Sequence, residues 1–294
     1  MEASDIKTIC VCGAGTMGSG IAQVAAQSGI ITIQFDLSVT MLEKSKAAIK
    51  RNLEYLLSKE RINQYESEAV FNRLSFTTSI NDCLADVVVE AIVEKPEAKA
   101  DLFSRLGAIN STRTIFASNT SSLSITALQQ MVPGPERFAG MHFFNPAHLM
   151  KLVEVVKGQY TDEHTVSLIY ALAQHMDKVP VHCNDAPGFI VNHVARPYYL
   201  EAMHLLEAGV ADAETIDTIM EATGFKMGPF KLMDLIGMDI NYSVSEQVWE
   251  ALGKPARLTP SAIQRAKVDA GELGRKSGKG FYSYVSGPEA RTER

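Results

Sequence analysis

The chain has 294 residues, 46% of them apolar and 21% charged, which is typical of a folded globular protein and argues against a disordered chain. Its net charge of -6 argues against a nucleic-acid partner, because proteins that bind DNA or RNA usually carry a basic excess. The first residues lack the basic and apolar halves of a signal peptide, and no apolar run reaches the ~18 residues that span a bilayer, so we expect no membrane partner.

Strands and helices alternate in the first half of the chain. A β-rich segment at 6–12 ends at glycines, a helix that stops at Gly29 is predicted over 16–29, and a long helix is predicted over 38–62. The further predicted strands lie at 31–36, 86–94, 114–119, 137–144, 151–158 and 178–183. This alternation predicts an α/β domain with a parallel sheet and helices on both faces.

The pattern changes near residues 184–187, and the rest of the chain is predicted to be helical. Asp212 and Thr259 resemble helix caps, and Gly209 and Gly271 resemble helix stops. The predicted helices cover 189–209, 212–224, 229–252 and 259–271, with one possible strand at 280–284 and a frayed tail at 286–294. We therefore predict two domains, residues 1–185 and 186–294.

The four cysteines are Cys10, Cys12, Cys83 and Cys183, and none belongs to a C-x-x-C pair. Cys10 and Cys12 fall on one face of a predicted strand, so we interpret them as small core residues. The spacing favours neither a structural disulfide nor a metal site, and a reducing, cytoplasmic location fits best.

A glycine-rich segment, CGAGTMGSG, follows the first predicted strand and opens a helix. Its G-x-G-x-x-G pattern allows a tight turn, close approach of the backbone to a pyrophosphate, and close packing of helix on strand. The N–H groups at the start of the helix can bind phosphates. The pattern predicts a dinucleotide site, with a tight turn without a ligand as the alternative, at residues Gly13, Ala14, Gly15, Thr16, Met17 and Gly18.

Asp36 ends the second predicted strand. A carboxylate at this position can accept hydrogen bonds from the adenosine ribose and would repel a 2′-phosphate, so it favours NAD over NADP. The alternative is that Asp36 is a helix N-cap ahead of Ser38.

Several blocks together resemble the short-chain-length (S)-3-hydroxyacyl-CoA dehydrogenases, and most closely the bacterial 3-hydroxybutyryl-CoA dehydrogenase type. They are CGAGTMGSGIAQVAAQSG, VVEAIVE, FASNTSSLSIT, GMHFFNPAHLMKLVEVVKG, APGFIVN, MGPFKLMDLIGMD and GRKSGKGFY. The resemblance covers nearly the whole chain, and the SNTSS and HFFNP blocks are specific to this family and its close relatives. One departure is His148, where relatives often have proline.

The resemblance implies a fold and a reaction. The fold is a Rossmann-type, doubly wound and mostly parallel sheet, followed by an all-helical C-terminal domain that mediates homodimerisation. The reaction is the NAD-linked interconversion of (S)-3-hydroxyacyl-CoA, expected here to be 3-hydroxybutyryl-CoA, and 3-ketoacyl-CoA.

Oxidation of an alcohol needs a base for the hydroxyl proton, and a histidine can serve near neutral pH if a carboxylate fixes its tautomer. His142 and Glu154 flank a turn at Asn145–Pro146, and two strands joined by this turn could bring them side by side. The resemblance implies that His142 is the acid/base and Glu154 its orienter. From the spacing alone, a satisfied core histidine is the favoured interpretation of His142.

The resemblance also implies that Ser121 binds the 3-oxygen of the substrate and that Asn192 supports the same oxygen or the histidine, so that the site would span both domains. The alternatives are a helix N-cap for Ser121 and a polar helix position for Asn192. For the cofactor, the resemblance implies Glu94 and Lys99 near the nicotinamide ribose, although these two could be a solvated pair. It further places Asn119, Asn145 and Lys276 near the nicotinamide.

A CoA thioester needs cations for its phosphates, and relatives use the basic helix after the second strand. We expect Lys50, Asn52 and Lys59 to bind CoA, although most such charge runs are solvated helix faces. Two rival functions remain: a dehydrogenase of the same fold that acts on a free hydroxy acid such as L-gulonate, and a non-catalytic NAD-binding protein.

Overall fold

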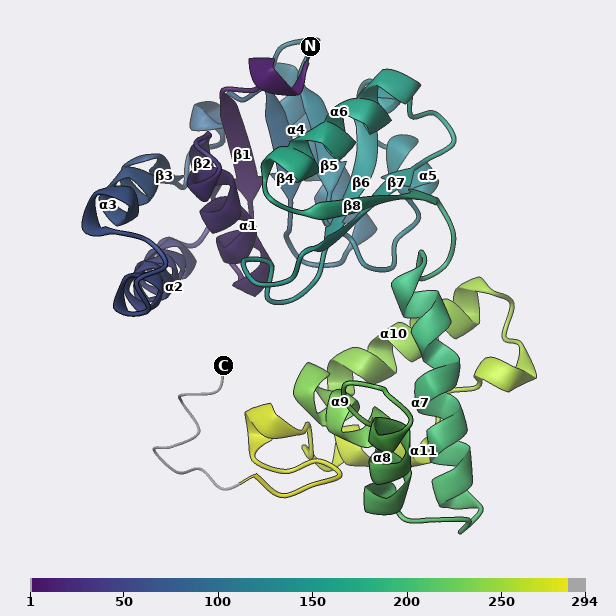
Figure 1. Cartoon of the computed structure of the whole chain (residues 1–294). Helices are drawn as coiled ribbons and strands as arrows, with labels where there is room; N and C mark the ends of the chain where they lie inside the picture. The colour runs from purple at the N-terminus through teal and green to yellow at the C-terminus, as the bar shows by residue number, and fades with distance from the viewer. Residues whose placement is uncertain (1, 285–294) are drawn as a thin grey trace. The chain divides into compact units, whose positions relative to one another are not determined.

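The computed structural model describes residues 2–284, so the predicted tail at 286–294 lies outside the described residues. The contacts within the chain define two compact units, one up to Phe189 and one from Ile190 on (Figure 1). The predicted boundary after residue 185 falls inside the first unit. Asp185 belongs there because its carboxylate accepts hydrogen bonds from the Ser124 hydroxyl and the N–H groups of Ile125 and Thr126.

The first unit is built on an eight-stranded sheet with the order β3-β2-β1-β4-β5-β6-β7-β8. Neighbouring strands are parallel except β6 and β7, which are antiparallel. The predicted doubly wound and mostly parallel sheet is confirmed. The strands are β1 Thr8–Cys12, β2 Ile31–Phe35, β3 Leu74–Thr77, β4 Val87–Glu90, β5 Ile115–Ser118, β6 Phe138–Phe143, β7 Leu152–Lys157 and β8 Val179–Asn184.

Helices cover both faces of the sheet, as the alternation predicts (Figure 1). Helices α1 and α6 pack on one face, and α4 and α5 pack on the other, while α2 and α3 pack beside α1 near β3. These helices are α1 Thr16–Gln27, α2 Val39–Ser58, α3 Gln64–Asn72, α4 Pro96–Ile109, α5 Ile125–Gln129 and α6 Glu163–His175.

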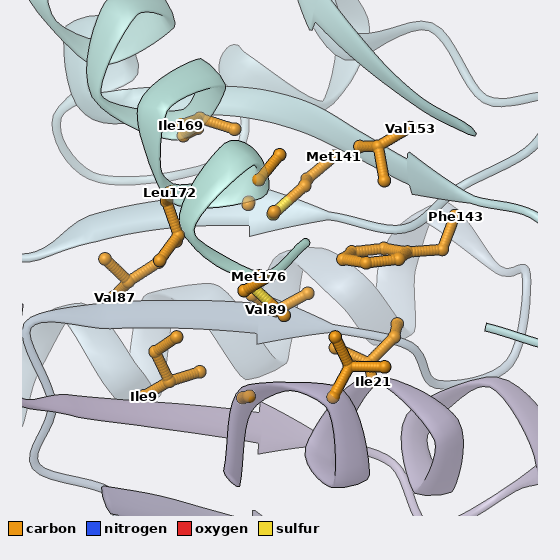
Figure 2. Packing of buried hydrophobic residues seen from close by; sticks show 14 of the residues in the cluster. Ile9, Ile21, Val87, Val89, Met141, Phe143, Val153, Ile169, Leu172 and Met176 are labelled. Atoms are coloured by element: carbon orange, nitrogen blue, oxygen red, sulfur yellow. The ribbon is translucent and has the colours of Figure 1, made fainter. Parts of the chain in front are cut away.

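Alternate residues of each strand enter different cores. Figure 2 shows the core under α1 and α6, where Val89, Met141 and Val153 pack against Ile21 and other helix residues. Residues one position further along each strand therefore face α4 and α5. Four polar residues fall on that second face, near the edge where β1, β4, β5 and β6 end: Glu90, Ser118, His142 and Glu154.

The first unit differs from the sequence-based expectation in one additional strand and in the ends of two elements. Strand β3 was not predicted because its side chains are only partly buried or exposed, so they show no apolar alternation. The strand predicted over 86–94 ends at Glu90. The helix predicted over 38–62 ends at Ser58, because Asn63 starts α3 with a capping box that it forms with Glu66.

The described part of the second unit is helical, as predicted. Its helices are α7 Val191–Glu207, α8 Ala213–Ala222, α9 Pro229–Ile236, α10 Met238–Ala251 and α11 Ala262–Asp269. The short 3₁₀ turns of the two units are η1 Ala3–Asp5, η2 Ile80–Asp82, η3 Pro135–Arg137, η4 Ala256–Leu258 and η5 Arg275–Ser277. The apolar faces of the helices of the second unit form one core that includes Tyr199 of α7, Phe230 of α9 and Met238 of α10.

The predicted cap at Asp212 is confirmed, because its side chain accepts the Thr215 N–H, and helices α7 and α11 are followed by left-handed Gly209 and Gly271. Three other details are corrected. The helix predicted over 229–252 is broken at Gly237, where φ is 103°. The cap of α11 is Ser261, not Thr259. Residues 280–284 form only an isolated bridge through Ser283 and no strand.

None of the helices within residues 2–284 is both long enough and apolar enough to cross a membrane.

Candidate active site

The glycine loop joins β1 to α1 at the edge of the sheet where β1, β4, β5 and β6 end. A side chain at Gly13, where φ is 106°, would collide with the carbonyl of Ala91, and one at Gly18 would collide with the carbonyl of Gly13. A Cβ at Gly15 would meet no atom within 4 Å. Packing therefore dictates two of the glycines, and the third leaves open space before the first turn of α1.

This open space fits a dinucleotide. Gly15 is the N-cap of α1 and has no side chain to satisfy the first N–H groups of the helix. Free N–H groups and the positive end of the helix dipole favour a pyrophosphate at this position. The observation that argues for a ligand is the space left at Gly15, which a tight turn alone does not require.

Asp36 links the glycine loop to the start of α2. Its Oδ2 accepts the Ala14 N–H at 2.8 Å, and its Oδ1 accepts the Ser38 N–H at 2.8 Å. The N-cap of α2 is Ser38, whose side chain accepts the Met41 N–H, so the alternative that Asp36 caps this helix is wrong.

His142 and Glu154 lie directly opposite each other in the antiparallel register of β6 and β7. The His142 Nδ1 is 2.7 Å from the Glu154 Oε2. The two residues are only 5% and 0% exposed. The ring of His142 also packs at 4.7 Å from that of Phe144 and 5.7 Å from that of Phe189.

This geometry fixes the imidazole. A buried carboxylate bonded to Nδ1 holds the proton on that nitrogen and sets the orientation of the ring, which leaves Nε2 to exchange a proton with a ligand. The histidine is buried, as a core residue would be, but its partner is an acid rather than a neutral group.

Asn119 and Asn145 follow the ends of β5 and β6. The Asn119 side-chain oxygen accepts the Phe143 N–H at 2.8 Å, and the backbone N–H of Asn119 donates to the Glu90 carbonyl at 2.7 Å. Asn119 therefore ties three neighbouring strand ends together. Asn145 is exposed and precedes Pro146 through a cis peptide bond.

Glu94 was expected at the end of the strand predicted over 86–94. It lies instead in the loop between β4 and α4. Its partner Lys99 is only 1% exposed, so the alternative of a solvated pair is wrong. The Lys99 Nζ is 3.1 Å from Glu94 Oε2 and 2.5 Å from Oε1 of Glu90, the last residue of β4.

Glu90 is a site residue that the sequence analysis missed. The signal was present in VVVEAIVE, where an acid interrupts a run of buried strand residues.

Ser121 lies in the loop after β5. Its N–H donates to Glu94 Oε1 at 3.1 Å. The N-cap of α5 is Ser124, whose side chain accepts the Ala127 N–H, so the alternative that Ser121 caps this helix is wrong. Ser121 is half-buried, and Glu94 holds its backbone.

The basic helix α2 presents its predicted CoA residues on different sides. Lys50 lines a groove of about 690 Å³ between α2 and α3. The Asn52 side chain instead donates to Gln23 of α1 at 2.9 Å, and Lys59 lies just beyond the end of α2, with its Nζ 5.7 Å from the ring centre of Tyr55. The structure does not gather these three side chains into one cluster.

The second unit holds the two remaining predicted residues. Asn192 lies in the first turn of α7, and its carbonyl accepts the Arg196 Nε–H at 2.9 Å. Lys276 forms an ion pair of 2.5 Å with Asp239. Their roles at a site with residues of the first unit stay predictions.

Comparisons with protein families match the chain in two parts. Residues 8–186 match "3-hydroxyacyl-CoA dehydrogenase, NAD binding domain", and residues 188–284 match "3-hydroxyacyl-CoA dehydrogenase, C-terminal domain". Together they cover almost all of the described residues.

Individual relatives agree with these matches. The chain is 44% identical over 93% of its length to a probable 3-hydroxybutyryl-CoA dehydrogenase of Deinococcus radiodurans, of which it covers 99%. It is 42% identical over 97% of its length to the 3-hydroxyadipyl-CoA dehydrogenase of Escherichia coli, of which it spans only 61%. A crystal structure of (S)-3-hydroxybutyryl-CoA dehydrogenase from Ralstonia eutropha superposes with a TM-score of 0.91 at 36% identity, covering 96% of this chain and 100% of that chain.

Proposed function

Because the chain belongs to the NAD-binding 3-hydroxyacyl-CoA dehydrogenase family of enzymes, we propose that it interconverts (S)-3-hydroxyacyl-CoA and 3-ketoacyl-CoA. The observation that carries the proposal is the buried His142–Glu154 pair at the sheet edge that also bears the glycine loop. A four-carbon substrate, 3-hydroxybutyryl-CoA, is favoured by the names of the relatives from Deinococcus radiodurans and Ralstonia eutropha.

We assign proton transfer to His142. Its Nε2 takes the hydroxyl proton during oxidation and returns it during reduction, while the Glu154 carboxylate stabilises the imidazolium through Nδ1. Bound NAD⁺ supplies the hydride acceptor. Ser121 donates its hydroxyl to the 3-oxygen of the substrate, and Asn192 supports the same oxygen from the second unit.

The same proposal gives the cofactor residues their roles. Glu94 and Asp36 accept hydrogen bonds from the two ribose groups, and the Asp36 charge disfavours a 2′-phosphate. Asn145 and Lys276 act near the nicotinamide, and Lys50 and Lys59 pair with CoA phosphates. The link from Asn52 to Gln23 orients α1 against α2, so its contact with CoA needs a rearrangement of that amide.

The proposal includes a homodimer that forms through the second unit. Large apolar side chains are exposed on its helices, among them Val194 at 70%, Ile219 at 56% and Leu235 at 48%. Such side chains are typical of a surface that a partner subunit covers. A cytoplasmic location also stays a prediction, which four free and buried cysteines support.

A direct test measures NADH oxidation with acetoacetyl-CoA and with dehydrogulonate as the free-acid competitor. We expect turnover with the CoA ester and none with the free acid. Turnover with the free acid alone would establish the rival dehydrogenase, and NADH binding without turnover of any ketoacyl-CoA would establish a non-catalytic protein. A series of 3-ketoacyl-CoA esters from C4 to C10 then fixes the chain length, with the highest kcat/KM expected at C4.

A further inference from the structure

Two carboxylates share one buried ammonium beneath the proposed cofactor site. The Lys99 Nζ is 2.5 Å from Glu90 Oε1 and 3.1 Å from Glu94 Oε2. The side chains of Lys99 and Glu90 are 1% and 0% exposed, and that of Glu94 is 31% exposed. A fully buried carboxylate is costly unless it is paired and hydrogen-bonded, so Glu90 and Lys99 depend on each other.

Glu90 is bonded to the backbone and to the next strand as well. Its Oε1 accepts the Ile92 N–H at 2.7 Å, and its Oε2 accepts the Ser118 hydroxyl at 2.7 Å. Its carbonyl accepts the Asn119 N–H at 2.7 Å. Glu90 thus fastens the exit of β4 to the end of β5, and its position fixes where the Lys99 ammonium lies.

Glu94 carries this order into the loop at residues 118–122. Its Oε1 accepts the Ser121 N–H and the Ser122 hydroxyl, each at 3.1 Å, and also the Thr120 hydroxyl. Its Oε2 faces Lys99. One oxygen of Glu94 therefore organises the loop that contains Ser121, and the other is held by the ammonium.

The charge of Glu94 depends on the same ammonium. Burial by itself disfavours the carboxylate, but Lys99 and the Thr120 hydroxyl outweigh it, so the pKa of Glu94 is lowered. The Lys99 ammonium pairs with both acids, and its side chain is only 1% exposed.

From these contacts we propose that Glu90 and Lys99 are positioning residues. They hold the Glu94 carboxylate and the 118–122 loop in place, and Lys99 supports the cofactor through the position and charge of Glu94. The part of this inference that concerns the cofactor rests on the proposed function, because it takes Glu94 as a ligand of the nicotinamide ribose. The part that concerns the loop stands on the contacts alone.

The first experiment measures the order of the loop without cofactor, as the rate of amide hydrogen exchange over residues 118–123 at one fixed pH. We expect faster exchange in Lys99→Met and in Glu90→Gln than in the wild type. The matched control is Arg105→Met, which removes an exposed cation from the same helix and should leave exchange unchanged. Equal exchange in all four proteins would overturn the positioning role.

The second experiment measures the Kd for NADH by titration between pH 5.5 and 8.5. In Lys99→Met the burial of Glu94 is no longer offset, so its pKa rises and its protonation weakens NADH binding at the acid end. We expect the Kd of this variant to rise roughly tenfold more at pH 5.5 than at pH 8.5, relative to the wild type. Adding Glu94→Gln to Lys99→Met should abolish this extra pH dependence, because the amide does not titrate.

The outcomes separate the two proposals. Altered loop exchange with unaltered NADH binding would keep the positioning role and remove Glu94 from the proposed cofactor site. An unchanged pH dependence in Lys99→Met would overturn the action of Lys99 through Glu94. If Lys99→Met does not fold, Glu90→Gln, which keeps the shape of the side chain, carries the exchange test, and a wild-type exchange pattern in it sinks the inference.

Discussion

His142 and Glu154 lie opposite each other because β6 and β7 pair in an antiparallel register across the loop at residues 144–151. A strand alternates its side chains, so both residues face α4 and α5 while their neighbours fill the other core. This pairing could be predicted, because the turn at Asn145–Pro146 and two apolar runs mark a strand pair. The pair of Glu90 and Lys99 could not be predicted, because the local sequence pattern does not show that a residue of α4 contacts the end of β4.

Lys178 is a second buried ammonium, and it holds the loop between β6 and β7. Its Nζ donates to the carbonyl of Ala147 at 2.6 Å and of Met150 at 2.9 Å. Burial, together with the charge of Lys151 and against the opposing charge of Asp177, lowers the pKa of Lys178 to about 8. The half-buried His148 also faces it, and burial together with the Lys178 charge lowers the pKa of His148.

The lowered pKa of Lys178 predicts how stability changes with pH. Between pH 8 and the ordinary lysine pKa of 10.5, the unfolded chain keeps a proton that the folded chain has released, so the contribution of Lys178 to the unfolding free energy rises with pH. Urea unfolding gives the unfolding free energy of each protein. The value for the wild type minus that for Lys178→Met should increase by roughly 1 kcal/mol from pH 8 to pH 9.5. The exposed Lys44→Met serves as control, and a difference that falls with pH contradicts the assignment.

At the scale of elements, different glycines of the glycine loop serve packing and cofactor binding. Gly18 sits against the Gly13 carbonyl, whereas Gly15 borders open space. We expect Gly18→Ala to lower the unfolding free energy by roughly 1–3 kcal/mol, because the backbone must shift. Gly15→Ala should lower it by less than about 1 kcal/mol, the loss of a better N-cap, and yet weaken NADH binding strongly.

Urea unfolding without cofactor and NADH titration measure these two effects. If Gly15→Ala binds NADH as tightly as the wild type, the space before α1 is not the pyrophosphate site.

The helix and strand features that could not be predicted from the sequence have a common cause. Strand β3 has no buried residue, so only its pairing with β2 reveals it. The break at Gly237 separates two segments that both read as helix, and the carbonyl and side-chain contacts of Asp234 with the segment at 274–284 show why α9 ends there. Local patterns predict an element where its burial is one-sided, and they fail where tertiary contacts decide.

At the scale of the whole molecule, the change from alternating strands and helices to helices alone predicts two units without any coordinates. The sequence pattern does not predict self-association, which rests on resemblance and on exposed apolar side chains. Val194 and Leu205 of α7 are 70% and 44% exposed and lie eleven residues apart, which places them on the same helix face.

The dimer can be tested by light scattering after gel filtration. We expect the wild type to have twice the chain mass of 32.1 kDa. Val194→Glu combined with Leu205→Glu should shift it toward one chain, whereas Tyr65→Glu, at a position of the first unit that is 79% exposed, should not. A wild type that elutes with the mass of one chain contradicts the proposed assembly.

The most direct measurement of the central proposal is turnover of Glu154→Gln with acetoacetyl-CoA and saturating NADH. Glutamine keeps the shape of the side chain but cannot stabilise the imidazolium, so we predict a kcat lower by roughly 10²–10⁴, with NADH affinity and unfolding midpoint close to those of the wild type. A variant that turns over at the wild-type rate would mean that the acid beside His142 has no part in the chemistry.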